Sequence, residues 1–347
     1  MSSATPVSGR AGGVVTFGEI MLRLSPPGHQ RLSQATSLEA TYGGGEANVA
    51  AGLAGLGLPA THVTCFPDNP LGHAAARHFR QYGVGLAGTV FRGERLGLYY
   101  LETGASLRAS QVVYDRAHSA FASLQPEWFA WNEILHDAQW LHWTGITPAI
   151  SAGAAQATRE AIAAARAQGL TVSADVNYRR NLWQYGAKAQ DIMPELVAGC
   201  DIIVCSEGDA VDLFGIEPEA GTGNGFASVA AQLLQRFPQL KQVLATKRKT
   251  QSASHERIKG MLFDAEQGYL QTPYYDLTPV VDRIGGGDAF LAGFLYGCLQ
   301  NHSAADALAF ATAASALKHT IPGDINLITP AEVEHILAGN VSGRLLR

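Results

Sequence analysis

The stretch VVDRIGGGDAFLAGFLYG, residues 280–297, is the most informative part of this sequence. Three consecutive glycines, residues 285–287, precede Asp288, and an apolar run that predicts a helix follows. Glycines let backbone N–H groups turn inward and permit a ligand to approach closely. The helix N-terminus adds unpaired N–H groups and a partial positive charge. The segment therefore predicts an anion site suited to a phosphate or to its transition state.

A carboxylate, Asp288, stands where the anion is expected, and it has two interpretations. Aspartate is a good N-cap residue, so Asp288 can simply cap the helix. Alternatively, Asp288 is a general base that takes a proton from an attacking hydroxyl, while the amides of Gly285, Gly286 and Gly287 stabilise the transferred phosphoryl group. The turn is not a Walker A loop, because no Gly-Lys-Ser/Thr follows. The turn alone leaves both interpretations open.

Around this segment, apolar β-branched runs alternate with stretches rich in alanine and leucine. Strands that are apolar on both faces and alternate with helices predict a mostly parallel sheet covered on both sides. We expect residues 1–12 to form a loose tail and residues 13–347 to form a single domain. The expected strands are 14–17, 61–66, 140–143, 170–176, 201–206 and 241–246. The expected helices are 46–56, 70–82, 151–167, 287–299 and 304–318.

Two regions interrupt the alternation, at about residues 20–42 and 86–117, where helical signals are few. Within the second region, VFRGERLGLYYLE (90–102) has strand-forming Val, Phe and Tyr on either side of a Gly-Glu-Arg turn. Neither region is long enough for a core of its own. We interpret both as strand excursions from the one domain that together form a small sheet able to act as a lid.

Composition excludes several classes of function. The chain carries 25 Lys+Arg against 30 Asp+Glu, a formal net charge of −5, without a basic block, so we expect no nucleic-acid partner. The four cysteines have no zinc-ligand spacing and fit core packing in a reducing compartment. The histidines form no metal-ligand pattern, and His142 fits a core position. Without a membrane span of about 18 apolar residues or a signal core, we expect a cytoplasmic protein with no membrane partner.

The glycine turn and a segment near the N-terminus together resemble the ribokinase/PfkB family of carbohydrate kinases. The turn is similar to the family's C-terminal signature, which usually reads Gly-Ala-Gly-Asp, often after Asp-Thr; this chain has Gly286, and Asp282-Arg283 before it. YGGGEANVAAGLAGLG (42–57) is similar to the other signature. The likeness covers roughly residues 13–335. It implies a ribokinase-like three-layer α/β/α sandwich with a small β-sheet lid, Asp288 as the base, and ATP with Mg²⁺.

Within the family, the chain is most similar to kinases of 2-keto-3-deoxygluconate, an acid sugar that is phosphorylated on a primary hydroxyl to its 6-phosphate. DVNYRRNLW (175–183) is the most specific stretch of this likeness. Its Arg179 comes at the carboxyl end of a strand, where open α/β sheets bind ligands. A guanidinium suits a carboxylate, because its planar fork makes two parallel hydrogen bonds. Alone, Arg179 would be interpreted as one half of a surface salt bridge.

The resemblance implies further sugar contacts from the lid. Tyr99, Tyr114 and Arg116 are implied to face the sugar, and strand alternation puts Tyr114 and Arg116 on one face. Arg116 and Arg179 together form a candidate clamp for the acid group. Tyr114 has packing within the lid as its alternative. The remaining implied sugar-site positions are Gly44, Asn48, which can instead stabilise its loop, Asp324, and Glu19, which can instead support its turn.

The nucleotide side departs from the family pattern. ATKRKTQSASHERIKG (245–260) lacks the glycines of the family's Thr-x-Gly-x-x-Gly loop. Thr246 and Arg248 are the phosphate-contact candidates, and a solvated turn is the alternative. Ser206 and Asp209 align with an Asn-x-x-Glu motif that orders magnesium and its waters; both are changed here, so we expect no direct metal ligand from the protein. The implied adenine-pocket position is Thr312.

Three other functions compete with this hypothesis. A kinase of fructose or ribose is disfavoured by the two arginines, and a catalytically silent sugar-binding regulator by the intact Asp288. A nicotinamide dehydrogenase is disfavoured because the chain lacks a GxGxxG fingerprint after its first strand. Lid sheets in this family often pair between subunits, so the resemblance also implies a homodimer or larger homo-oligomer through the lid.

Overall fold

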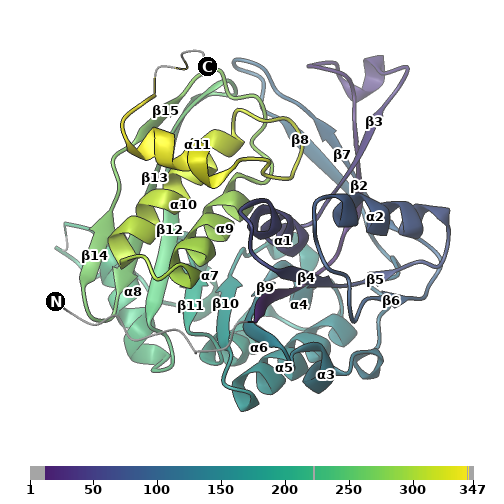
Figure 1. Cartoon of the computed structure of the whole chain (residues 1–347), viewed down its shortest axis with the longest axis horizontal. Helices are drawn as coiled ribbons and strands as arrows, with labels where there is room; N and C mark the ends of the chain where they lie inside the picture. The colour runs from purple at the N-terminus through teal and green to yellow at the C-terminus, as the bar shows by residue number, and fades with distance from the viewer. Residues whose placement is uncertain (1–11, 222, 342, 344–347) are drawn as a thin grey trace.

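The centre of the molecule is a nine-stranded sheet with the order β14-β13-β12-β11-β10-β9-β1-β4, and β15 pairs with β13 (Figure 1). The computed structural model describes residues 12–221, 223–341 and 343, so the expected N-terminal tail lies, apart from Gly12, outside the described residues. The parallel strands are β1 (Gly13–Phe17), β4 (Ala60–Val63), β9 (Ala138–Thr144), β10 (Thr171–Asp175), β11 (Ile202–Val204) and β12 (Gln242–Ser252).

Antiparallel strands complete this sheet at one edge. β13 (His255–Asp264) pairs with β12 over most of its length, and β14 (Gly268–Gln271) and β15 (Tyr275–Leu277) pair with β13. The sequence did not predict these three strands. The outer half of β12 carries exposed lysines and an exposed arginine, and β13 carries half-buried charged residues opposite them. The two-sided apolar pattern that marks a central strand is therefore missing there.

The sheet is buried on both faces, as the apolar runs predict. Trp140 and Leu141 are neighbours on β9 that point to opposite faces, and both are fully buried in different core clusters. The face of Trp140 is covered by α1 (Gly45–Gly55), α2 (Pro70–Gln81), α9 (Gly286–Leu299) and α10 (Ala304–Lys318). The other face is covered by α3 (Trp131–Ile134), α5 (Ala152–Ala167), α6 (Ala189–Ala198), α7 (Glu207–Phe214) and α8 (Gly225–Arg236).

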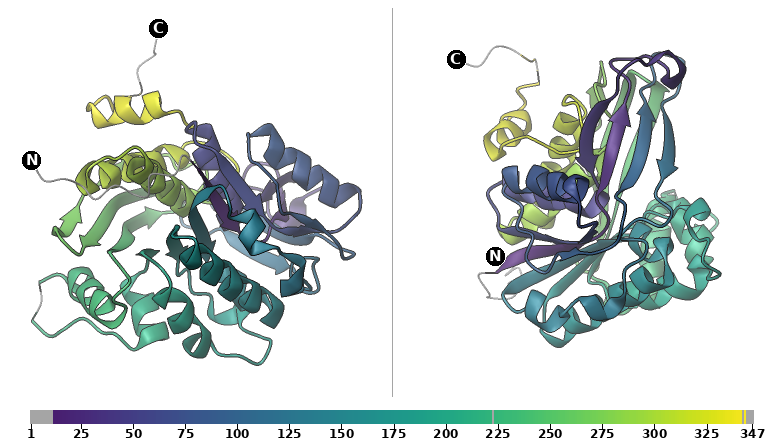
Figure 2. Two further views of the ribbon diagram at one scale, coloured as in Figure 1. Left: turned by 60° about the horizontal axis from the view of Figure 1, so that its bottom comes forward. Right: turned by 90° about the vertical axis from the view of Figure 1, so that its right-hand side faces the viewer.

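These helices give the three layers of an α/β/α sandwich, which Figure 2 shows from two further directions. Each predicted helix is present, with ends shifted by at most one residue, whereas residues 61–66 divide into β4 and the two-residue β5 (Cys65–Phe66). The remaining helical segments are α4 (Ile146–Ile150), α11 (Pro330–Leu337), which packs on α10, and 3₁₀ turns at Leu32–Gln34, Pro126–Trp128 and Arg180–Leu182.

The two interruptions of the alternating pattern form a separate four-stranded sheet, the lid, which confirms the expected lid. Its strands are β3 (Glu39–Gly43), β2 (Met21–Ser25), β7 (Gly97–Glu102) and β8 (Gln111–Asp115), in that order. The lid stands away from the helical layers in the right-hand view of Figure 2. β6 (Val90–Phe91) belongs to neither sheet, because it pairs with β5, so the strands on either side of the Gly-Glu-Arg turn do not pair with each other.

Residues expected in the core are found there. His142 is fully buried, accepts or donates one hydrogen bond with Ser173 at 3.0 Å, and burial lowers its pKa to about 3, so the ring is neutral. All four cysteines are free thiols, three of them buried. Among the described residues, no helix is long and apolar enough to cross a membrane.

Helices α9 and α10 approach so closely that their contact requires glycine. A Cβ added to Gly293 would lie 2.9 Å from the Cα atom of Ala311, which real side chains do not tolerate. The substitution Gly293→Val should therefore destabilise the fold by about 1–3 kcal/mol through overpacking. Gly208→Val, at an exposed position of α7 with open space around it, should change stability by only about 0.5 kcal/mol. Urea unfolding measures both, and equal losses would contradict the close packing.

Candidate active site

The predicted site residues surround one cleft of about 440 Å³ between the lid and the carboxyl ends of the parallel strands. Glu19 follows β1, Asp175 ends β10, Ser206 follows β11, and Thr246 lies within β12. Open parallel sheets bind ligands at the carboxyl ends of their strands, where loops from neighbouring strands converge. The predicted residues that line the cleft are Gly285, Gly287, Asp288, Gly44, Asn48, Tyr99, Tyr114, Arg116, Arg179, Asp324, Ser206, Thr246 and Arg248.

The glycine turn has the geometry of an anion site. Gly285 is the N-cap of α9 with φ = +79°, and a Cβ there would lie 1.9 Å from the carbonyl oxygen of Asp324, so only glycine fits. The first turn of α9 carries no side-chain cap, and the N–H of Gly286 donates to the carbonyl of Arg283 at 3.3 Å. Among the described residues, the N–H groups of Gly287 and Asp288 have no such partner and are left to a ligand. Gly286 is buried behind the cleft, where its carbonyl accepts a hydrogen bond from Ser315 at 2.7 Å.

Asp288 does not cap α9, because its carboxylate makes no cap hydrogen bond there. Instead, Asn48 Nδ2 donates to Asp288 Oδ2 at 2.7 Å from the first turn of α1. Gly45 lies close by, since a Cβ on it would be 3.7 Å from Asp288 Oδ1. The N-termini of α1 and α9 therefore meet at this one carboxylate, at the wall of the cleft. This placement excludes the capping interpretation and leaves the carboxylate free for chemistry.

The environment raises the pKa of Asp288 to about 7. Burial is the largest cause, the hydrogen bond from Asn48 opposes it, and the negative charges of Asp175, Asp324 and Glu46 add to it. A carboxylate with a pKa near neutrality accepts a proton effectively and is still partly ionised at neutral pH. The site thus holds a group with the properties of a general base.

A buried charge network supports the glycine turn from the lid side. Arg23 on β2 donates to Asp282 at 2.8 Å and to Asp324 at 2.7 Å, and all three side chains are at most 9% exposed. Burial alone would lower the pKa of Arg23, but the two carboxylates raise it, so the guanidinium stays charged. Asp282 also accepts from the backbone N–H groups of Ile284 and Gly323, each at 3.0 Å. Sequence reasoning missed Arg23, because its partners lie far along the chain.

The same network fixes one of the implied sugar-site residues. Tyr99 on β7 is 5% exposed and donates its hydroxyl to the carboxylate of Asp324. Burial raises the pKa of Asp324, while Arg23 and Tyr99 lower it. Tyr99 and Asp324 therefore reach the cleft as a hydrogen-bonded pair, anchored by Arg23.

Two arginines enter the cleft in different states. Arg116, next to the end of β8, is paired with the buried Glu19, to which its Nε donates at 2.8 Å, and its guanidinium lies 5.8 Å from the ring of Tyr114. Arg179 is exposed, and among the described residues its guanidinium hydrogen-bonds only with the carbonyl of Tyr178, at 3.3 Å. The guanidinium of Arg179 is consequently more available to a ligand than that of Arg116. Glu19 fixes the orientation of Arg116.

The nucleotide-side candidates are partly brought together. Thr246, Arg248 and Ser206 line the cleft, whereas Thr312 is fully buried in α10 and donates to the carbonyl of Leu308 at 2.8 Å. The structure thus does not bring Thr312 to the cleft. Ser206 caps α7 and exchanges hydrogen bonds with Asp209, donating to its carboxylate at 2.8 Å and accepting from its N–H at 3.1 Å.

Asp175 is a cleft residue that sequence reasoning missed as a site residue, although it begins the DVNYR stretch. Its pKa is raised to about 7, mainly by burial and next by the charge of Asp209, while Arg179 lowers it. Within the described residues, no group of three or more His, Cys, Asp or Glu side chains is arranged to hold a metal ion. Asp175 and Asp209 nevertheless suit Mg²⁺, which commonly takes one or two carboxylates and completes its shell with phosphates and water.

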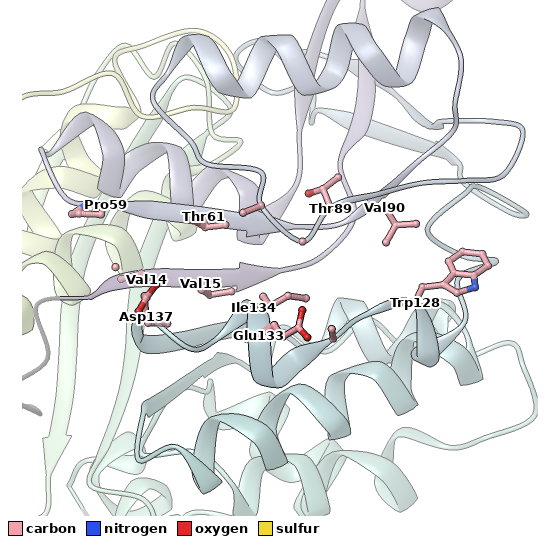
Figure 3. Close-up of a pocket in the computed structure, with 15 residues that line it drawn as sticks. Val14, Val15, Pro59, Thr61, Thr89, Val90, Trp128, Glu133, Ile134 and Asp137 are labelled. Carbon is pink, nitrogen blue, oxygen red and sulfur yellow. The ribbon is translucent and has the colours of Figure 1, made fainter.

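A larger hollow of about 650 Å³ lies at the opposite edge of the sheet, at the amino ends of β1, β4 and β9 (Figure 3). Val14, Pro59, Trp128 and Ile134 contribute apolar surface to it. Its charged lining groups are the carboxylates Glu133 and Asp137, and no lysine, arginine or histidine among the described residues lines it. The described residues that line it therefore supply no positively charged side chain for an anion.

Comparisons with known proteins agree with this fold. The model of the pfkB family of carbohydrate kinases matches residues 12–331. The chain accordingly belongs to this family of kinases.

Comparison with individual proteins shows which members of the family the chain is similar to. A 2-dehydro-3-deoxygluconokinase of Thermotoga maritima superposes with a TM-score of 0.90 at 42% identity, over 94% of this chain and 98% of that one. A PfkB family carbohydrate kinase of Listeria grayi gives a TM-score of 0.88 at 38% identity, over 94% and 99% of the two chains. A 2-dehydro-3-deoxygalactonokinase of Haloferax volcanii is 34% identical, over 95% of this chain and 98% of that protein. The chain is thus similar to kinases of 2-keto-3-deoxy acid sugars.

The raised pKa of Asp288 predicts how turnover depends on pH. On the acid side of about pH 7 the carboxyl is protonated and no longer accepts a proton, so kcat/KM for the sugar should fall about tenfold per pH unit. Asp175→Asn removes a like charge, so it should lower the pKa of Asp288 and shift this acid limb, the fall of kcat/KM at acid pH, to lower pH without abolishing it. A pH profile that loses its acid limb in the Asp175 variant would assign the limb to Asp175 instead.

Proposed function

We propose that this protein transfers the γ-phosphoryl group of ATP to the primary hydroxyl of 2-dehydro-3-deoxy-D-gluconate, forming its 6-phosphate. The observation that carries the proposal is the composition of the cleft. Two arginines, Arg116 and Arg179, share it with an amide-lined glycine turn and a carboxylate of neutral pKa. The two arginines can bind an anionic substrate, while the amides of the glycine turn can stabilise the phosphoryl group that is transferred.

The chain's own residues divide the reaction between them. Arg179 and Arg116 bind the sugar carboxylate and orient the far end of the molecule toward Asp288. Asp288 accepts the proton of the attacking hydroxyl, and Asn48 holds its carboxylate in place at 2.7 Å. The backbone N–H groups at the start of α9 receive the negative charge of the phosphoryl oxygens. The lid sheet covers the acceptor side and excludes water, which competes with the hydroxyl.

Magnesium fits this arrangement as a partner of the nucleotide. Asp175 and Asp209 are the protein carboxylates that would hold it or its waters, and when bound it would supply positive charge to the phosphate oxygens. Within the described residues, neither carboxylate belongs to a group of three or more His, Cys, Asp or Glu side chains placed to hold a metal ion.

A second candidate substrate is 2-dehydro-3-deoxy-D-galactonate, which differs in the configuration of one hydroxyl-bearing carbon. The 34% identity to a 2-dehydro-3-deoxygalactonokinase favours it as an alternative. A coupled assay of ADP release over both acid sugars, fructose and ribose tests the proposal. We expect kcat/KM to be highest for the gluconate-derived sugar. Preference for a neutral sugar, or absence of turnover, would contradict the proposed function.

The carboxylate role of Arg179 is testable by matched variants. Arg179→Gln should raise KM for the acid sugar by about tenfold to a hundredfold, since a charge-assisted bidentate contact is lost. KM for the uncharged methyl ester of the same sugar should change little. Arg180→Gln is the control, because Arg180 is exposed, lies outside the cleft and faces Asp212. Equal effects on acid and ester would show that Arg179 does not bind the carboxylate.

We further propose that the protein is a homodimer or larger homo-oligomer that pairs through its lid. β8 is an edge strand whose residues are all exposed, including Val112 at 38% and Val113 at 52%. Unpaired apolar edge strands favour pairing with another chain. Sedimentation velocity should show an oligomer for the wild type and a monomer for Val113→Lys. A monomeric wild type would contradict the proposal.

A further inference from the structure

Glu256 on β13 is a fully buried carboxylate held between two arginines. Its Oε2 lies 3.2 Å from Arg283 Nη2 and its Oε1 lies 3.5 Å from Arg248 Nε. Neither oxygen has a hydrogen-bond partner among residues 12–341, leaving out 222, although both are inaccessible to water. A buried charge without good hydrogen bonds is costly, so these loose ion pairs are what compensates its burial.

Both arginines open into the cleft on its nucleotide side. Arg248 and Arg283 line it, and their side chains are 39% and 29% exposed. Arg283 directly precedes Ile284 and the glycine turn, and its Nη2 donates to the carbonyl of Ser252 at 2.6 Å. Within the described part of the chain, its Nε is buried without a hydrogen-bond partner, and the guanidinium of Arg248 makes no hydrogen bond with the protein. The exposed parts of the two guanidinium groups, above all that of Arg248, are therefore available to a ligand in the cleft.

The charges of this group do not cancel. Two guanidinium groups face one carboxylate, which leaves one unit of positive charge at the wall of the cleft. The planar guanidinium fork matches the spacing of phosphate oxygens and binds them through parallel hydrogen bonds. The position beside Gly285 places this charge next to the amides that are to receive the transferred phosphoryl group.

The geometry points to Arg283 as a nucleotide-phosphate-binding residue that acts with Arg248, with Glu256 as the positioning residue that holds both arginines when no phosphate is bound. This inference rests on the proposed function, because it takes the phosphates to be those of ATP. It links two departures from the family signatures. Residues 245–260 lack the glycines of a phosphate loop, and an arginine stands at 283, so two side chains replace backbone amides.

Binding of ATP, ADP and adenosine, measured by isothermal titration calorimetry, tests the inference. Arg283→Gln should weaken ADP and ATP binding by about tenfold or more, while adenosine binding stays unchanged and shows that the fold is intact. Arg283→Lys, which retains the charge but not the fork, should recover part of the affinity. Arg159→Gln is the control, because Arg159 pairs with Glu195 outside the cleft. Unchanged ADP affinity in the Gln variant would overturn the inference.

The role of Glu256 predicts a different response. Glu256→Gln leaves the two arginines without their counter-ion, so the melting temperature without ligand should fall. ADP then supplies the missing negative charge, and its addition should raise the melting temperature more in the variant than in the wild type. If Glu256 were purely structural, Glu256→Gln would lower the melting temperature equally with and without ADP. The rise in melting temperature on adding ADP would then equal that of the wild type, and this result would contradict the positioning role.

These results separate the inference from the proposed function. A wild type that phosphorylates the acid sugar, with ADP binding insensitive to Arg283→Gln, would overturn the inference alone. A wild type that phosphorylates no acid sugar, with ADP binding that depends on Arg283, would overturn the proposed substrate and support the phosphate site.

Discussion

The hydrogen bond between Asn48 and Asp288 joins the N-termini of α1 and α9, which come from opposite ends of the chain. Helix N-termini attract anions, so two of them directed at one place favour the binding of a phosphoryl group beside the carboxylate of Asp288. Glycines at both helix starts allow the approach, and the close contact of α9 with α10 fixes the direction of α9. The rest of the cleft is arranged around this junction.

The buried pairs of Arg23 with Asp282 and Asp324 extend the same constraint to the lid. Arg23 belongs to a lid strand, whereas Asp282 precedes the glycine turn and Asp324 follows α10. Loss of one partner of a buried ion pair costs about 3–5 kcal/mol, so this connection holds the base of the lid firmly against the turn. The outer part of the lid reaches the β12–β13 hairpin, where Ala253 donates to the carbonyl of Ser106 at 2.7 Å. The cleft, the glycine turn and the lid are thereby one connected unit.

Much of this architecture could be predicted from sequence, because it depends on local patterns. The parallel core strands and their helices follow from two-sided apolar runs, and the glycine turn follows from three adjacent glycines before a helix. The antiparallel β13–β15 edge was missed, since its exposed half carries the charged residues typical of a loop. The contacts of Arg23 with Asp324 and of Asn48 with Asp288 join residues more than 200 positions apart in the chain. Glu256 is buried, although the sequence alone would place a glutamate on the surface. Such long-range polar contacts leave no periodic signal in one sequence.

The central claim is that Asp288 removes the proton from the attacking hydroxyl. Single-turnover phosphorylation of 2-dehydro-3-deoxy-D-gluconate by Asp288→Asn, at saturating ATP, measures this step most directly. The account predicts a rate lower by about 10²–10⁴-fold, because only proton acceptance is lost. ATP affinity, measured on the same protein, should stay close to that of the wild type. A phosphorylation rate within about tenfold of the wild type would contradict the claim.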